Sequence, residues 1–134
     1  MNGVIAVRSL LVADTGVTAL VPVARIAAGM LPQGTDLPAI SLMSVSGVDR
    51  NISAPGPKRR VTERVQVTVL ARTYPEVKAI LAAVRNAAAD QMPAIDGLTD
   101  VTVHTDSAGP DFLDEETGIH MQTQDFRVSF NEAR

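Results

Sequence analysis

Alternation between apolar and polar side chains over residues 60–72 is the clearest pattern in the chain. One phase of this stretch holds mainly arginine, threonine and glutamine. The other phase holds Val61, Val65, Val67, Val69 and Ala71. Because successive side chains of a strand point to opposite faces, the pattern predicts a strand with one face on a core and the other in water.

A helical pattern follows directly after this strand. Thr73 and Glu76 have the spacing of a capping box, and Pro75 between them suits the first turn of a helix. Apolar residues then recur at helical spacing, as Val77, Ile80, Leu81, Val84 and Ala88. The sequence therefore predicts an amphipathic helix that begins after Thr73 and is closed by Met92 and Pro93.

A second helix is predicted near the start of the chain. Val4, Val7 and Leu11 lie on one face of a helix over residues 3–13. Thr15 is expected to cap a short turn that ends before Pro22.

Shorter apolar runs predict four further strands, and polar stretches rich in glycine and proline predict the loops between them. The strands are expected over residues 25–28, 39–46, 100–105 and 119–131, with loops over residues 29–36, 47–58 and 107–118. The strand over 39–46 has apolar residues on both phases, so we expect it to be partly covered on both faces.

The last of these strands changes phase. Met121 is apolar on an odd position, whereas Phe126 and Val128 are apolar on even positions. A strand of period two cannot keep both sets on one face. The sequence therefore predicts a β-bulge or bend near residues 123–125.

The order of elements sets the fold class. It runs helix, three strands, helix, two strands, without regular alternation of strands and helices. This order favours an α+β fold with a mostly antiparallel sheet of about four to five strands and two helices packed on one face. The length of 134 residues fits a single domain over 1–134.

Composition narrows the classes of function. The chain has no cysteine, which excludes disulfides and thiolate chemistry, and only 3% of its residues are aromatic. A formal charge of −3 gives no overall attraction to nucleic acid or to an anionic membrane. No stretch approaches the roughly 18 apolar residues of a membrane-spanning helix, so no membrane partner is expected.

No catalytic, cofactor-binding or metal-binding residue can be assigned from a motif. The chain lacks the nucleophile elbow, the phosphate-binding glycine loops and the zinc-protease motif. His104, Asp106 and His120 lie on two strands that could pair, which leaves a metal-dependent hydrolase as a weak alternative. Solvent-facing histidines explain these residues more simply, so we expect no enzyme and no cofactor.

The loop over residues 47–58 leads into a basic run. Lys58, Arg59 and Arg60 could bind phosphates, so a small nucleic-acid-binding module remains a second alternative. We prefer a contact with a neighbouring subunit, because exposed loops of this length are often functional. The candidate contact residues are Asn51, Pro55, Lys58, Arg59, Arg60 and Arg64.

The layout as a whole resembles a known family. Its parts are an N-terminal helix ending at Asp14, the pair Arg25 and Ile26, the segments 37–40 and 64–69, the helix over 75–88, and the segment 125–128. In this order they resemble the tail-completion, or tail terminator, proteins of long-tailed bacteriophages and gene-transfer particles.

The resemblance implies a structural role in the virion tail, with assembly in the host cytoplasm. Members of the family form a hexameric ring at the head-proximal end of the tail tube, where the ring stops tube growth. The implied partners are identical subunits, the tail-tube protein and a head-tail connector or stopper protein. DNA would pass through the ring lumen without sequence-specific binding. No cofactor or reaction is implied.

Overall fold

A computed structural model of the chain describes residues 2–50 and 56–134. The helices are α1 (Asn2–Ala13), α2 (Thr15–Thr18) and α3 (Tyr74–Ala88), with a 3-10 turn η1 over Val23–Arg25. The strands are β1 (Ile26–Ala28), β2 (Ala39–Arg50), β3 (Lys58–Ala71), β4 (Leu98–Ala108), β5 (Phe112–Asp114) and β6 (Ile119–Ala133).

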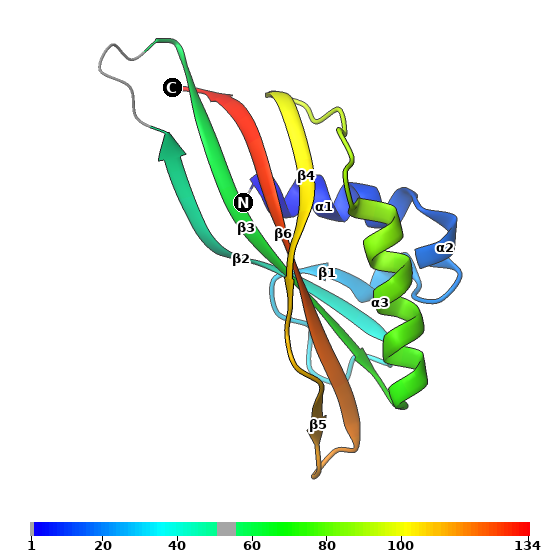
Figure 1. Ribbon diagram of the computed structural model, residues 1–134. Helices are drawn as coiled ribbons and strands as arrows, with labels where there is room; N and C mark the ends of the chain where they lie inside the picture. The colour runs from blue at the N-terminus through cyan, green and yellow to red at the C-terminus, as the bar shows by residue number, and fades with distance from the viewer. Residues whose placement is uncertain (1, 51–55) are drawn as a thin grey trace.

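The strands form one sheet whose order is β1-β2-β3-β6-β4, with β5 also paired to β6. Only the pairing of β1 with β2 is parallel. Helices α1 and α3 lie against the same face of the sheet (Figure 1). This arrangement confirms the predicted α+β class, with six strands instead of four to five.

The core lies between this face of the sheet and the two long helices. The alternating valines of β3 are buried, as predicted, and so are the apolar stripe of α3 and the stripe of α1. Glu63 shares the buried phase of β3 and is 5% exposed. A Cβ atom at Gly3 would lie 2.5 Å from Glu63 Oε2, so a glycine at this position of α1 lets the helix approach the strand closely.

The start of α3 confirms the predicted helix cap. The amide of Glu76 donates a hydrogen bond to Thr73 Oγ1 at 3.3 Å, and Pro75 lies in the first turn. The cap of α2 differs from the prediction. The amide of Val17 donates to the carboxylate of Asp14 at 3.0 Å, so Asp14 and not Thr15 is the capping residue.

The predicted loop over residues 47–58 is wrong for residues 47–50 and for Lys58, which belong to strands, and is confirmed for residues 56–57. Strand β2 continues to Arg50 and β3 begins at Lys58, because the two strands pair in register as far as Arg50 opposite Arg60. A register shift between Ser44 and Ser46 leaves Val45 as an extra residue on β2. The far half of β2 is also exposed on both faces, so only its first residues are covered as predicted.

A register irregularity does occur next to the predicted position of the bulge, but its extra residue belongs to the neighbouring strand β4 and not to β6. The pairing of β6 with β3 is continuous over residues 120–133, without a register shift. The pairing of β6 with β4 contains two register shifts, one of which faces residues 124–126 of β6. Met121 lies on the outer face, away from the helices, where Phe112 of β5 pairs with it. The apolar residues of β6 change phase because Met121 lies on the outer face, whereas Phe126 and Val128 lie in the core. No bulge in β6 is required.

The predicted polar loop over residues 107–118 contains more structure than expected. Ser107 and Ala108 still belong to β4, and Phe112–Asp114 forms β5 against the start of β6. No helix in the described part of the chain is long and apolar enough to cross a membrane.

Candidate subunit interface

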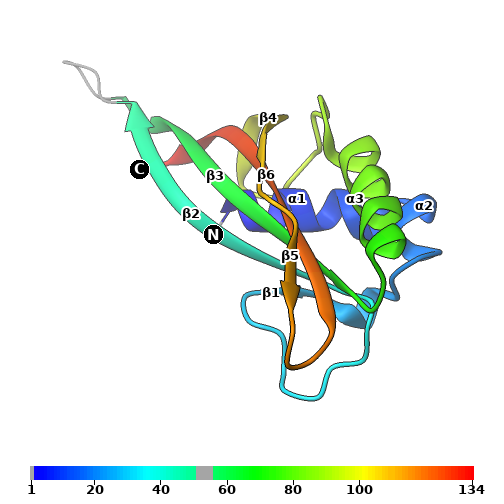
Figure 2. The ribbon, with the colours of Figure 1, turned by 60° about the horizontal axis from the view of Figure 1, so that its bottom comes forward.

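At one end of the sheet, the far part of β2 lies beside the first part of β3, which pairs with β6 on its other side (Figures 1 and 2). We call this part of the sheet the arm; it consists of residues 43–50 of β2 and 58–64 of β3. Strand β1 pairs only with residues 40–42 of β2. In the described part of the chain, no strand pairs with residues 43–50 on the side away from β3. The arm therefore presents an open sheet edge.

The open edge carries apolar side chains. Met43, Val45 and Val48 are 42%, 46% and 66% exposed. Exposed apolar residues on an unpaired strand favour contact with another chain, because the edge offers both backbone hydrogen bonds and apolar surface.

Of the predicted contact residues, Asn51 and Pro55 lie outside the described part of the chain. Lys58 is exposed at the end of the arm, where its Nζ lies 3.5 Å from Thr99 Oγ1. Arg50, at the end of β2, is also exposed, and its side chain makes no hydrogen bond or ion pair with the described residues. The end of the arm therefore carries available positive charge.

The other predicted arginines contact their own chain. Arg59 pairs with Asp49 at 3.7 Å and with Glu132 at 3.4 Å. Arg60 donates to the backbone carbonyl of Asp100 at 2.8 Å. The two carboxylates partly neutralise Arg59, and the hydrogen bond to Asp100 holds the Arg60 side chain against its own subunit.

Arg64 makes the strongest ion pair of the group. Its Nε and Nη2 lie 2.7 Å and 2.5 Å from Asp125 Oδ2, and Asp106 lies 3.8 Å away. Asp125 is 3% exposed although it lies on the outer face of the sheet. Because a buried carboxylate requires a partner, Arg64 acts first as a structural residue.

The two histidines do not form a metal site. His104 lies on the outer face opposite Arg127, and its Nδ1 is 2.8 Å from Asp90 Oδ1. His120 is half-buried on the helix side of the sheet, where its ring meets the edge of Tyr74 with centroids 6.3 Å apart. Within residues 2–50 and 56–134, no group of His, Asp or Glu is arranged to hold a metal ion.

A projection lies at the opposite end of the sheet (Figure 1). We call it the acidic hairpin; it consists of residues 111–121, including β5 and the start of β6. The sequence predicts a polar loop up to residue 118 and a strand from residue 119. Phe112 and Leu113 are 57% and 46% exposed, and the turn that follows contains Glu115 and Glu116.

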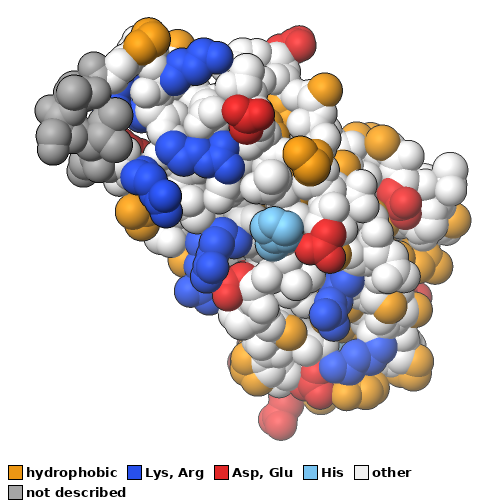
Figure 3. Space-filling model, turned by 45° about the horizontal axis from the view of Figure 1, so that its top comes forward, with side chains coloured by type: hydrophobic (Ala, Val, Ile, Leu, Met, Phe, Trp, Pro, Cys, Tyr) orange, Lys and Arg blue, Asp and Glu red, His pale blue; other side chains and the backbone are white. Residues whose placement is uncertain are grey.

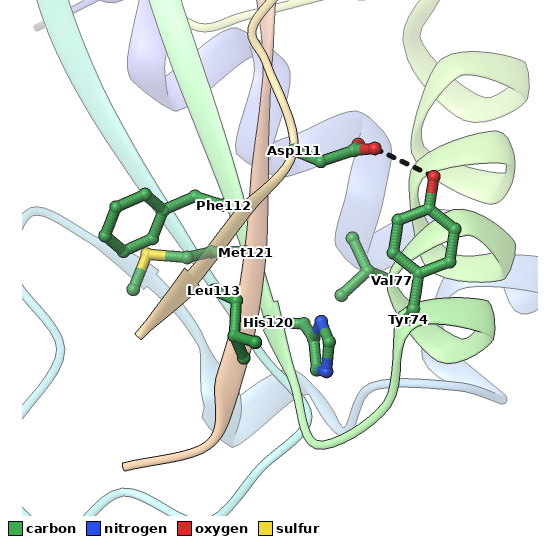
Figure 4. Close-up of a pocket in the computed structure, with 7 residues that line it drawn as sticks. All are labelled: Tyr74, Val77, Asp111, Phe112, Leu113, His120 and Met121. Atoms are coloured by element: carbon green, nitrogen blue, oxygen red, sulfur yellow. Dashed lines mark hydrogen bonds between the residues drawn. The ribbon is translucent and has the colours of Figure 1, made fainter. Parts of the chain in front are cut away.

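Contacts with α3 fix the base of the acidic hairpin. The hydroxyl of Tyr74 donates to Asp111 Oδ2 at 2.8 Å (Figure 4), and Lys78 Nζ donates to Asp111 Oδ1 at 2.6 Å. Lys78 also donates to Gln122 Oε1 at 2.6 Å. The hydrogen bond from Lys78, and then that from Tyr74, lower the pKa of Asp111, and the same bond to Asp111 raises the pKa of Lys78.

Two hollows flank the acidic hairpin. The first, of about 210 Å³, lies between the hairpin and α3 and is lined by Tyr74, Val77, Asp111, Phe112, Leu113, His120 and Met121 (Figure 4). The second is a largely apolar groove of about 340 Å³ on the outer face, lined by Thr68, Pro110, Phe112, Met121, Gln122 and Thr123. Phe112 and Met121 border both hollows.

Comparison with models of protein families identifies the family of this chain. Residues 5–130 match the family described as "Tail completion protein gp17". The chain belongs to this family. Tail completion proteins are structural components of the virion tail, so the protein is a structural subunit of a phage-type tail. The family supports neither the nucleic-acid-binding module nor the metal-dependent hydrolase.

Solved structures confirm the fold of this tail completion protein. It is similar to a chain of the structure titled "Virion of native gene transfer agent (GTA) particle", with a TM-score of 0.74 and 19% sequence identity. The similarity covers 97% of this chain and 96% of the other. No curated protein sequence matches the chain.

Proposed function

We propose that copies of this tail completion protein form a closed ring, a hexamer, at the head-proximal end of the tail tube. The ring ends the growth of the tube and joins it to a head-tail connector or stopper protein, while DNA passes through the lumen without sequence-specific contacts. The whole chain, 1–134, acts as one domain in this role and catalyses no reaction. The observation that carries the proposal is the open edge of β2 on the arm.

An open sheet edge exposes a monomeric protein to uncontrolled pairing with other chains. Residues 43–50 leave backbone donors and acceptors without a strand partner on one side, and three apolar side chains stand along them. Proteins usually cover or blunt such edges, since they invite uncontrolled pairing. In a closed ring every copy covers the edge of its neighbour, and growth stops when the ring closes.

The predicted contact residues fit this surface. Lys58 lies at the end of the arm, and Arg59 and Arg60 follow it on β3. We propose that these three residues, together with Asn51, Pro55 and Arg64, lie in or next to the contact between subunits or between the ring and a tail protein. Arg64 contributes indirectly, because its ion pair with Asp125 holds the outer face of the sheet together.

Replacing an apolar residue of the open edge by a charged one tests the proposal. We expect Val48→Lys to leave the subunit folded and monomeric, because Val48 is 66% exposed and lines no core. Wild-type protein should form rings of uniform mass. Native mass spectrometry and negative-stain microscopy would measure the two states. Met30→Lys is the matched control, since Met30 is 89% exposed and lies in the loop after β1.

The role in the particle needs a separate measurement. Without the protein, tail tubes should exceed their normal length and remain separate from heads, and wild-type protein supplied in trans should restore joined particles. Normal tail lengths and normal joining in its absence would contradict the proposed function.

A further inference from the structure

We infer that the arm of one copy docks on the acidic hairpin of the next copy in the ring. This inference rests on the proposed function, because it names the surface that receives the open edge. Arm and acidic hairpin lie at opposite ends of the same sheet (Figures 1 and 2), so they cannot meet within one subunit. A contact between two different surfaces of identical chains is heterologous, and such contacts build rings when the rotation closes.

Charge is the first argument. At the end of the arm, Arg50 and Lys58 are exposed and no acidic side chain of the described residues pairs with them. In the turn of the acidic hairpin, Glu115 and Glu116 are exposed and no basic side chain of the described residues pairs with them. Lys and Arg side chains gather beside the grey segment in Figure 3, whereas both acidic and basic side chains are visible toward the opposite end.

The arm also contains an acidic side chain and the base of the acidic hairpin a basic one, but both are in ion pairs within the subunit. Asp49 is paired with Arg59 on the arm, and Asp111 is paired with Lys78 at the base of the acidic hairpin. Arg72, which follows β3 at the same end of the sheet, offsets part of the negative charge. Arg50 and Lys58 at one end, and Glu115 and Glu116 at the other, therefore remain for contact between subunits.

Apolar surface is the second argument. Val45 and Val48 are exposed on the arm, and Val45 is the extra residue that the register shift leaves without a partner on β3. The groove of about 340 Å³ beside the acidic hairpin is lined by the apolar residues Pro110, Phe112 and Met121. We infer that the apolar edge of the arm enters this groove, with the charged residues of both surfaces around it. Such a contact has the apolar centre and polar rim of a specific interface.

The acidic hairpin is also held ready for docking. Hydrogen bonds from Tyr74 and Lys78 to Asp111 tie it to α3, at 2.8 Å and 2.6 Å. A surface that is ordered before binding loses less entropy when the partner arrives.

Reciprocal charge reversal tests the inference. The arm variant is Arg50→Glu with Lys58→Glu, and the hairpin variant is Glu115→Lys with Glu116→Lys. We expect each variant to remain folded by circular dichroism and to lose the ring in native mass spectrometry at about 0.15 M salt. The chain that carries all four substitutions should regain the ring, because its arm and hairpin are again opposite in charge. Asp36→Lys with Arg85→Glu is the control, since both residues are exposed outside the two surfaces.

An equimolar mixture of the arm variant and the hairpin variant gives a stricter test. Each arm then meets an oppositely charged hairpin only if the two variants alternate, so rings should return with equal numbers of both. Full ring formation by either variant alone would overturn the inference and leave the proposed function standing. Failure of the four-substitution chain to assemble, or mixtures that stop at two subunits, would also overturn it. Absence of rings in wild-type protein would instead contradict the proposed function.

Discussion

At the residue scale, pairing within the chain decides which charges are available to a partner. Arg64 lies on the wet face of β3, where a simple strand pattern presents it to solvent. Its guanidinium is instead held by Asp125, which is 3% exposed, and by Asp106. Arg50 and Lys58, which have no such carboxylate, carry the charge that remains.

The carboxyl of Asp111 provides a titration test at this scale. Hydrogen bonds from Lys78 and then Tyr74 lower its pKa below the ordinary value of 3.8. The stabilisation from this carboxylate is therefore present above about pH 3.8 and is lost as pH falls through the lower folded-state value. We expect Lys78→Met to raise the pKa of Asp111 toward 3.8, measured by NMR of its side-chain carbonyl carbon.

Lys58→Met is the control for that titration, because Lys58 lies on the arm, far from Asp111. It should leave the pKa of Asp111 unchanged. An Asp111 carboxyl that already titrates at 3.8 in the wild-type protein would show that the bonds to Lys78 and Tyr74 do not persist in solution.

At the scale of elements, caps and neighbouring strands decide where helices and strands begin and end. The capping residue Thr73 could be recognised from Glu76 and Pro75 because a helix start is a local feature. The end of β2 depends on β3 instead, since pairing with residues 60–63 extends β2 through a Gly-Val-Asp-Arg stretch that favours no strand by itself. Strand ends are therefore set by partners that are distant in sequence.

The two threonines at helix starts give a direct comparison. We expect Thr73→Ala to reduce the free energy of unfolding by about 1 kcal/mol, because the amide of Glu76 loses its capping acceptor. Thr15→Ala should change it little, since the Thr15 side chain makes no hydrogen bond with the described residues and Asp14 caps α2. Urea unfolding would measure both. Equal effects of the two substitutions would contradict the assignment of the caps.

At the scale of the whole molecule, the layout separates core from contact surfaces. The helices and the buried face of the sheet form the core, and the outer face, the arm and the acidic hairpin remain open (Figures 1 and 2). On the outer face, arginine side chains form ion pairs with carboxylates of the same chain, such as Arg127 with Asp106 at 3.7 Å.

Weak interaction with nucleic acid follows from this charge distribution. The chain has a net charge of −3, and its outer-face residues Arg64 and Arg127 are paired with carboxylates. We expect the isolated subunit not to retain duplex DNA at about 0.15 M salt, measured by fluorescence anisotropy across a salt titration. Tight binding that weakens steeply with salt and disappears in Lys58→Glu would contradict this expectation.

The sequence by itself determined the elements whose signals are local or periodic. Alternation over residues 60–72 identified β3 and its buried side, and helical spacing after Thr73 identified α3, because burial of one face imposes these periods on the chain. The order of these elements was enough for the fold class. The family layout was also visible in the sequence, and the match over residues 5–130 confirms it.

Only the tertiary structure reveals the open edge and the acidic hairpin, which we propose as contact surfaces. The open edge of β2 exists because β1 is three residues long and covers only the start of its neighbour. The acidic hairpin is ordered because Tyr74 and Lys78 reach Asp111, more than thirty residues away along the chain. His104 and His120 were placed together by sequence and lie on opposite faces of the sheet. Such contacts depend on register and on which element covers which face, and no local pattern encodes either.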